Sequence, residues 1–156
     1  MAYKIINVAL NFAEVSESKT PVENIKNILS FIHQYIHYEY DLGDTNSAPV
    51  ETLAYKSGDC DDFGILAAAL FKSVGINVAI ARFKNKDVTA SKQGHIMVLV
   101  RLDDLGGYGY FYYSSLTNIG LTSGKWIIIE PQYTIDYQGY SQWFNQWQLV
   151  AAVQIS

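Results

Sequence analysis

Cysteine is nearly absent from this chain, since Cys60 is the only one among 156 residues. A lone thiol cannot form a disulfide within the chain, which leaves it reactivity, metal binding or burial as a small apolar side chain. Basic residues are also in the minority, with 11 Lys and Arg against 15 Asp and Glu and a formal net charge of -4. Because nucleic-acid backbones are bound by clustered basic residues, this balance argues against a nucleic-acid partner.

The chain also lacks long apolar runs. No stretch approaches the length of a membrane span, and residues 4–11 are too short and too polar for the apolar part of a secretory signal peptide. We therefore expect no membrane partner and a cytoplasmic location, with release from the cell by another route left open. No linker or low-complexity segment divides the chain, and 49% of its residues are hydrophobic. This predicts one domain over residues 1–156 with a substantial core.

Cys60 lies where a polar loop, residues 56–59, runs into an apolar helical stretch. Asp59 is expected to cap this helix, with Asp62 three residues later completing a capping box. The positive end of the helix dipole favours a thiolate, so the position suits a nucleophile. Core-facing side chains follow on the same face as Cys60 at helical spacing: Phe63, Leu66, Ala67, Leu70, Phe71 and Val74.

Two later apolar segments each carry one ionisable residue at an end. His95 begins the segment 94–100, and Glu130 lies near the end of the segment 125–131. If these are neighbouring antiparallel strands, the start of one lies beside the end of the other, and the imidazole meets the carboxylate. A carboxylate on one ring nitrogen would fix the tautomer and leave the other nitrogen to take the proton of Cys60.

The rest of the pattern predicts helices first and antiparallel strands afterwards, which is an α+β domain. An apolar stripe that follows Thr20 and Pro21 predicts a helix to about Tyr38, and residues 40–51 are expected to form a loop. The segment 3–12 fits either a strand or a helix. Strands are expected at 76–83, 94–102, 108–113 and 125–130, with an exposed loop at 84–92.

Two other groups of residues have both a functional and a structural interpretation. His33 and His37 are four residues apart on the first helix and could chelate a metal, but no third ligand is near, which favours solvated or packing histidines. Aromatic residues are dense in the segment 106–113 and at four later positions: Tyr140, Trp143, Phe144 and Trp147. They could stack on a sugar or an extended peptide, and a core strand and an amphipathic helix are the favoured interpretations.

The segments around the three candidate residues resemble the transglutaminase-like superfamily of papain-like cysteine enzymes. The likeness is carried by residues 49–53 with 58–66 and 74–78, by residues 94–98 and by residues 126–131. The resemblance implies a papain-like transglutaminase core, in which the nucleophile helix packs on an antiparallel β-sheet. It also implies that Cys60 is the nucleophile, His95 the general base and acid, and Glu130 the third member of the triad.

The chain departs from the family pattern in three respects. Glutamate stands at position 130, where the family usually has aspartate, and the segment 103–124 is longer than the usual hairpin. No tryptophan precedes Cys60, so the side-chain donor of the oxyanion hole is unassigned. The backbone N–H of Cys60 can serve as the other donor.

Three carboxylates, Asp59, Asp61 and Asp62, crowd negative charge around Cys60, which disfavours a thiolate. Helix capping is the default interpretation of these residues. In calcium-dependent periplasmic proteases of the same superfamily, acidic residues that flank the nucleophile bind calcium, and Asp59 and Asp61 are similar to that pair. We expect no required cofactor, and we keep calcium at Asp59 and Asp61 as the alternative.

Together these observations predict a thiol hydrolase that cleaves an amide or isopeptide bond in a peptide or protein through a thioester on Cys60. A protein-glutamine transglutaminase, which passes the acyl group to an amine, would use the same acyl-enzyme. A catalytically inert transglutaminase-like module that binds peptides is the third alternative, against which the intact set of Cys60, His95 and Glu130 argues. The sequence leaves the oligomeric state open.

Overall fold

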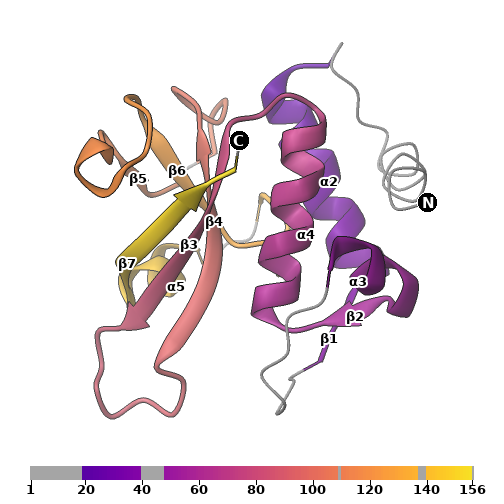
Figure 1. The fold of residues 1–156 in the computed structure, drawn as a ribbon, viewed down its shortest axis with the longest axis horizontal. Helices are drawn as coiled ribbons and strands as arrows, with labels where there is room; N and C mark the ends of the chain where they lie inside the picture. The colour runs from indigo at the N-terminus through magenta and orange to yellow at the C-terminus, as the bar shows by residue number, and fades with distance from the viewer. Residues whose placement is uncertain (1–18, 40–47, 109, 137–139, 156) are drawn as a thin grey trace.

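The structure is a computed structural model that describes residues 19–39, 48–108, 110–136 and 140–155. The segment 3–12, which fits either a strand or a helix, lies outside the described residues. Within the described part, the helices between Pro21 and Ser73 form one layer, a five-stranded antiparallel sheet forms the other, and the helix Tyr140–Asn145 lies on the far face of that sheet (Figure 1). This arrangement confirms the predicted α+β class. None of the described helices is long and apolar enough to cross a membrane.

Helix α2, Pro21–Tyr35, begins where the sequence predicts. The Thr20 hydroxyl accepts the N–H of Glu23 at 3.2 Å, and the Glu23 carboxylate accepts the N–H of Thr20, which is a capping box. The predicted apolar stripe is buried in full: Ile25, Ile28, Leu29, Ile32 and Ile36. The helix ends before Ile36, three residues earlier than expected, because the backbone becomes extended there.

The extended residues after α2 form a short strand, β1, His37–Tyr38. It pairs in parallel with β2, Ser57–Gly58, which immediately precedes Asp59 and Cys60. The N–H of His37 donates to the carbonyl of Lys56 at 2.8 Å, and the N–H of Glu39 donates to that of Gly58 at 2.7 Å. These two bonds hold the end of α2 beside the residues that immediately precede Cys60.

Helix α3, Pro49–Tyr55, corrects the prediction of a loop through residue 51. Proline at the first helical position is a helix-start signal, and the Glu51 carboxylate accepts the N–H of Ala48 at 3.3 Å. The apolar pattern of this segment is too short to show a helical period, so the prediction was wrong. Lys56, with φ of 57°, ends the helix in the left-handed conformation.

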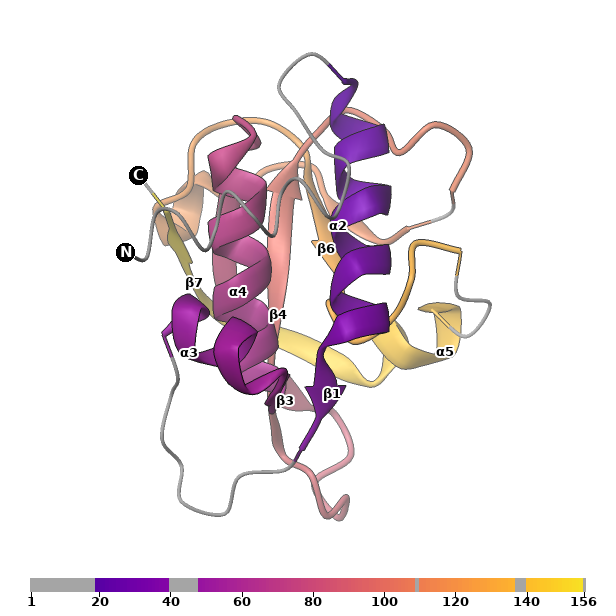
Figure 2. The same cartoon turned by 90° about the vertical axis from the view of Figure 1, so that its right-hand side faces the viewer.

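Helix α4, Cys60–Ser73, is the central helix of the fold, as the sequence predicts. It packs beside α2 and against the sheet (Figure 2). Gly64 marks the closest approach, because a Cβ there would lie 2.8 Å from Ile96 Cγ2. The absence of a side chain at this position lets the helix that begins at Cys60 rest on the strand that carries His95.

The sheet has the order β5-β6-β4-β3-β7, with every neighbouring pair antiparallel. Three strands lie within two residues of the predicted bounds: β3, Val78–Asn85; β4, Gly94–Arg101; and β6, Trp126–Ile129. Strand β5 covers only Tyr112–Tyr113 of the predicted 108–113. The edge strand β7, Trp147–Gln154, has no counterpart in the sequence-based prediction.

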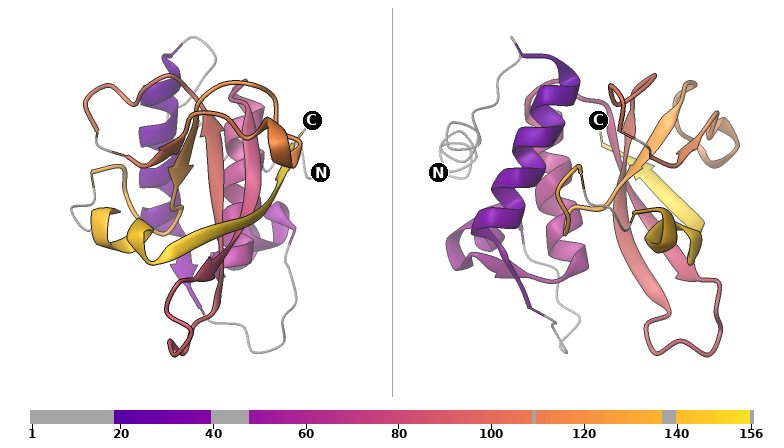
Figure 3. Two further views of the ribbon diagram at one scale, coloured as in Figure 1. Left: turned by 90° about the vertical axis from the view of Figure 1, so that its left-hand side faces the viewer. Right: turned by 180° about the vertical axis from the view of Figure 1, so that it is seen from behind.

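The two faces of the sheet have separate cores. One face packs against α2 and α4, with Val98 and Ile129 among its buried residues. The opposite face, which includes Met97, is crossed by the 3₁₀ turn η1, Thr117–Ile119, and by α5, Tyr140–Asn145 (Figure 3). Within this second core lie Trp126, Phe144 and Trp147. The segment of the chain that leads into β7 therefore covers the face away from α4.

Candidate active site

Strands β4 and β6 bring two of the predicted site residues together. They are antiparallel neighbours, with Val98 opposite Ile129 and Leu99 opposite Ile128. This register sets the start of β4 beside the end of β6, and His95 Nε2 contacts Glu130 Oε2 there. Both residues are buried, with 2% of His95 and 0% of Glu130 exposed. The predicted meeting of this imidazole with this carboxylate is confirmed.

The carboxylate of Glu130 is held by donors besides His95. Its Oε1 accepts the backbone N–H of Gln132 at 3.1 Å, and its Oε2 accepts the indole N–H of Trp143 at 3.1 Å. A buried charge is stable only where such hydrogen bonds replace water. The side chain of Glu130 is thereby fixed in place from three directions.

Two tryptophans enclose the His95 ring. Trp147 is stacked on it at a centroid distance of 4.9 Å and an angle of 30°, and Trp143 meets it edge-on at 5.4 Å and 89°. The sequence favours a packing role on an amphipathic helix for both, which is correct for Trp143 on α5 and wrong for Trp147, the first residue of β7. The density of aromatics was the only sequence signal of their position. Trp143 comes from α5, on the far face of the sheet, and Trp147 from the start of the edge strand β7, so both side chains hold the imidazole in place.

The second ring nitrogen of His95, Nδ1, is buried and has no hydrogen-bond partner among the residues that the structure describes. A neutral imidazole that donates through Nε2 presents a lone pair at Nδ1. An unpartnered buried polar atom is unusual, and such atoms call for an explanation in terms of strain, function or an absent partner. With Glu130 on Nε2, this nitrogen is the free position for a proton.

Cys60 is the first residue of α4, and its predicted cap is confirmed. Asp59 Oδ1 accepts the N–H groups of Asp61 and Asp62 at 3.1 and 3.3 Å, and Asp62 Oδ2 accepts the N–H of Asp59 at 3.1 Å. Gly58 makes this cap fit, because a Cβ there would lie 2.6 Å from that of Asp62. The Asp59 side chain accepts the N–H groups of the second and third helical residues. The backbone N–H of Cys60, the first helical residue, is left for another acceptor.

The surroundings of Cys60 disfavour a resting thiolate. Burial raises the pKa of the thiol to about 11, more than the backbone N–H of Ile96 and the charge of Lys92 lower it, and Asp61 and Asp59 raise it further. The thiol itself contacts the Asp61 carboxylate at 3.5 Å. The thiol of Cys60 is therefore protonated near neutral pH.

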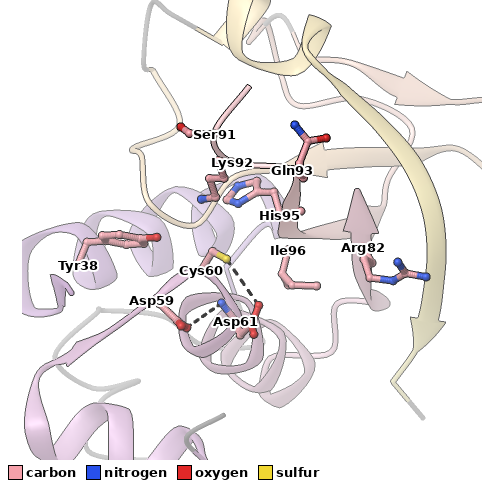
Figure 4. A pocket seen from close by; sticks show the side chains of 11 residues that line it. Tyr38, Asp59, Cys60, Asp61, Arg82, Ser91, Lys92, Gln93, His95 and Ile96 are labelled. Carbon is pink, nitrogen blue, oxygen red and sulfur yellow. Dashed lines mark hydrogen bonds between the residues drawn. The ribbon is translucent and has the colours of Figure 1, made fainter. Parts of the chain in front are cut away.

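Cys60 and His95 line one cavity of about 360 Å³ (Figure 4). No hydrogen bond joins the two side chains in this structure. Strand alternation turns Ile96 toward α4, where its Cγ2 approaches Gly64, and turns His95 toward the tryptophans. The remaining lining residues come from the β1–α4 region and the β3–β4 hairpin: Tyr38, Asp59, Asp61, Arg82, Ser91, Lys92, Gln93, Gly94 and Ile96.

Comparison with known families identifies the fold. A model described as the transglutaminase-like superfamily matches residues 9–131. The chain belongs to this superfamily. The resemblance seen in the sequence is thereby confirmed, and the cavity lies between the superfamily's nucleophile helix and the sheet beside it. A search of curated protein sequences finds no match.

Solved structures of other proteins share this superfamily fold. LapG of Legionella pneumophila matches with a TM-score of 0.66 at 16% identity, over 99% of this chain and 84% of that one. Its calcium-bound form matches with a TM-score of 0.64 at 16% identity, over 97% and 83% of the two chains. A candidate cysteine protease of Cytophaga hutchinsonii matches at 0.54 and 16%, over 99% and 49%. At this identity the likeness concerns the fold.

The acidic residues beside Cys60 supply only part of a calcium site. Calcium takes about six to eight oxygen ligands, whereas Asp59 Oδ1 already accepts two amides of the helix. In the part of the chain that the structure describes, no three His, Cys, Asp or Glu side chains cluster as metal ligands. Burial, together with the charges of Asp62 and Asp61, raises the pKa of Asp59, so a cation would relieve repulsion there.

His33 and His37, the other candidate ligands, do not form a metal site within the described residues. The His33 ring Nδ1 lies 3.2 Å from the carbonyl oxygen of Gln132, and both histidines line a second cavity of about 310 Å³. That cavity also touches Tyr38, so it adjoins the cavity of Cys60 across this one side chain. The two histidines therefore belong to the surroundings of the site.

Proposed function

We propose that this protein is a cysteine hydrolase that cleaves an amide or isopeptide bond in a peptide or protein substrate. The observation that carries the proposal is that Cys60 and His95 line one cavity. The buried Nδ1 of His95 has no hydrogen-bond partner among the described residues, which supports it as the proton acceptor. The Glu130 carboxylate occupies the opposite ring nitrogen. Nucleophile, base and orienting carboxylate are the parts that acyl transfer by a thiol requires.

In the proposed reaction His95 Nδ1 takes the thiol proton as Cys60 Sγ attacks the substrate carbonyl carbon. The resulting tetrahedral oxyanion accepts the backbone N–H of Cys60, which the helix cap leaves available. The C–N bond then breaks, the imidazolium protonates the leaving amine, and a thioester remains on Cys60. Water attacks the thioester with His95 again as the base, which releases a carboxylic acid and restores the thiol.

The burial of the site supports a role for Glu130 in this cycle. An imidazolium inside a protein is costly unless a negative charge lies beside it. Glu130 provides that charge through Nε2 and, since Trp143 and the amide of Gln132 hold it, needs no rearrangement during the reaction. We also infer that a calcium ion at Asp59 and Asp61 would lower the pKa of the Cys60 thiol, and no step above depends on it.

Peptide cleavage by the intact protein tests the proposal. The protein and its Cys60→Ala variant are incubated with a diverse peptide mixture that includes side-chain isopeptides, and new termini are read by mass spectrometry. The proposal expects new termini with the wild type and none with Cys60→Ala. A fluorescent primary amine in a parallel reaction distinguishes transamidation, since incorporation of the amine without new carboxylates would contradict hydrolysis.

A further inference from the structure

The reaction leaves one requirement unassigned, a side-chain donor for the oxyanion opposite the Cys60 amide. We propose that the hydroxyl of Tyr38 is this donor. The inference rests on the proposed function, because it assigns a residue to the same acyl-transfer site. It is carried by the position of Tyr38 on the paired strand next to the nucleophile, by the contacts of its ring and by its place in both cavities.

The backbone fixes Tyr38 beside the nucleophile. In the parallel pair of β1 and β2, Tyr38 is the register partner of Gly58, two residues before Cys60. The hydrogen bonds of His37 and Glu39, the neighbours of Tyr38, to the Lys56 and Gly58 carbonyls hold this register from both sides. Because α4 begins at Cys60, two residues after Gly58, this pairing holds Tyr38 close to the start of that helix.

The ring of Tyr38 is held on two sides. It meets the ring of Phe63, on α4, edge-on at a centroid distance of 5.7 Å and an angle of 68°. Lys92 Nζ lies over the Tyr38 ring, 5.9 Å from its centroid. The backbone of Lys92 is itself anchored, since the buried Asn85 donates to its carbonyl at 3.0 Å. With the ring held, the hydroxyl points into the cavity toward Cys60 (Figure 4).

Tyr38 also stands where a substrate would pass. It lines both the cavity of Cys60 and the cavity that contains His33 and Gln132. A peptide that extends from one cavity into the other would cross the Tyr38 side chain. Its reacting carbonyl, above Cys60, would then have the hydroxyl on one side and the helix start on the other.

Gln93 is another uncharged side-chain donor that lines the cavity. The Gln93 side-chain amide donates to the carbonyls of Ala90 and Asp87 within its own loop. Lys92 and Arg82 are the cationic residues that line the cavity, and the ammonium group of Lys92 lies over the Tyr38 ring. A tyrosine hydroxyl can donate to an oxyanion and keep its proton throughout, so no further reactant is required.

The experiment compares two reactions of Cys60 that differ in whether an oxyanion forms. p-Nitrophenyl acetate acylates a thiol through a tetrahedral intermediate, whereas iodoacetamide alkylates it by direct displacement. Tyr38→Phe keeps the ring against Phe63 and removes only the hydroxyl. We expect Tyr38→Phe to slow acylation by roughly 10²- to 10³-fold and to leave alkylation unchanged. Tyr55→Phe, whose ring is 75% exposed, is the matched control and should change neither rate.

Every other outcome contradicts either the role of Tyr38 or the proposed function. Equal acylation of Tyr38→Phe and wild type, with Cys60→Ala unreactive, overturns the role of Tyr38 and leaves the proposed function standing. Equal slowing of acylation and alkylation also overturns it, since Tyr38 would then act only on structure. A loss of acylation in Lys92→Met with none in Tyr38→Phe assigns the donor to Lys92 instead. Acylation that persists in Cys60→Ala contradicts the proposed function itself.

Discussion

His95 Nε2 contacts Glu130 Oε2 at the ends of two neighbouring antiparallel strands, and both side chains are buried. The carboxylate also accepts from Trp143 and from the amide of Gln132, so its position is set before any substrate binds. This pairing determines which ring nitrogen is available for chemistry. In the proposed reaction the proton of Cys60 goes to Nδ1, and the first prediction tests that assignment.

Replacing His95 with alanine should slow acylation of Cys60 near neutral pH by roughly 10²- to 10⁴-fold, the range that a positioned general base contributes. The reason is that burial raises the pKa of the thiol to about 11, so few thiolates exist without a base. Acylation by p-nitrophenyl acetate, followed across pH, measures the effect. His33→Ala, which removes an exposed imidazole from the neighbouring cavity, is the control. Equal rates in His95→Ala and wild type would rule out His95 as the base.

The raised pKa of Cys60 also predicts how stability depends on pH. The unfolded thiol ionises near its ordinary value of 9.0, whereas the folded thiol ionises at about 11. Between these values the unfolded state binds fewer protons, so the free energy of unfolding falls as pH rises. Below pH 9 the contribution is constant. Urea unfolding of wild type and Cys60→Ala between pH 8 and 11 should show the difference between them shrinking with pH, and a constant difference would contradict the assignment.

The features of this site that could be predicted are those that local sequence patterns specify. Strand alternation and one antiparallel pairing sufficed to bring His95 to Glu130, and a run of polar residues before an apolar helix sufficed to cap Cys60. Trp143 and Trp147 escaped prediction because their contacts with His95 depend on how the chain returns across the far face of the sheet. Nothing in the local sequence specifies that path.

The errors in secondary structure have similar causes. Helix α3 is seven residues long, so tertiary packing rather than periodicity decides it. Strand β5 shrinks to Tyr112–Tyr113, although the whole aromatic segment has high strand propensity. An edge strand has a single neighbour, so its length depends on how many residues of that neighbour pair with it. The interior strands β3, β4 and β6, whose composition reflects burial, were predicted well.

Trp143→Phe should lower the free energy of unfolding and the acylation rate of Cys60 more than Trp147→Phe does. Trp143→Phe removes the indole donor of the buried Glu130, whereas the indole N–H of Trp147 has no hydrogen-bond partner to lose. Both changes remove similar volume, so the difference isolates the hydrogen bond. We expect Trp143→Phe to cost about 1–3 kcal/mol of unfolding free energy beyond Trp147→Phe, measured by urea denaturation. Slower acylation of Cys60 should accompany it, and equal effects of the two changes would remove Trp143 from the positioning of Glu130.

Gly64→Ala should destabilise the protein although alanine is the better helix former by about 1 kcal/mol. A Cβ at this position would lie 2.8 Å from Ile96 Cγ2, so helix and strand must separate. Overpacking of this kind costs about 1–3 kcal/mol. Urea denaturation measures the loss, and acylation of Cys60 should slow as the nucleophile moves from β4. The double variant Gly64→Ala, Ile96→Ala removes the clash and should recover acylation, and failure to recover would assign another cause.

Calcium should raise the melting temperature if it binds the folded state at Asp59 and Asp61. Binding to the native state alone stabilises it by mass action, so the rise must grow with calcium concentration. Magnesium should do less, because it demands stricter geometry and sheds water reluctantly. Asp61→Asn removes a ligand charge without touching the cap, whose acceptors are on Asp59 and Asp62. Asp61→Asn should therefore reduce the rise in melting temperature with calcium and leave the cap of α4 intact.

The same ion should change the chemistry of the thiol. Asp61 and Asp59 both raise the pKa of Cys60, and a bound dication would offset them. Alkylation of Cys60 near neutral pH should then speed up with calcium in the wild type and respond less in Asp61→Asn. A melting temperature and an alkylation rate indifferent to both calcium and chelator would leave helix capping as the role of these carboxylates. In that case His95, the Ile96 amide and Lys92 alone must counter the burial of the thiol.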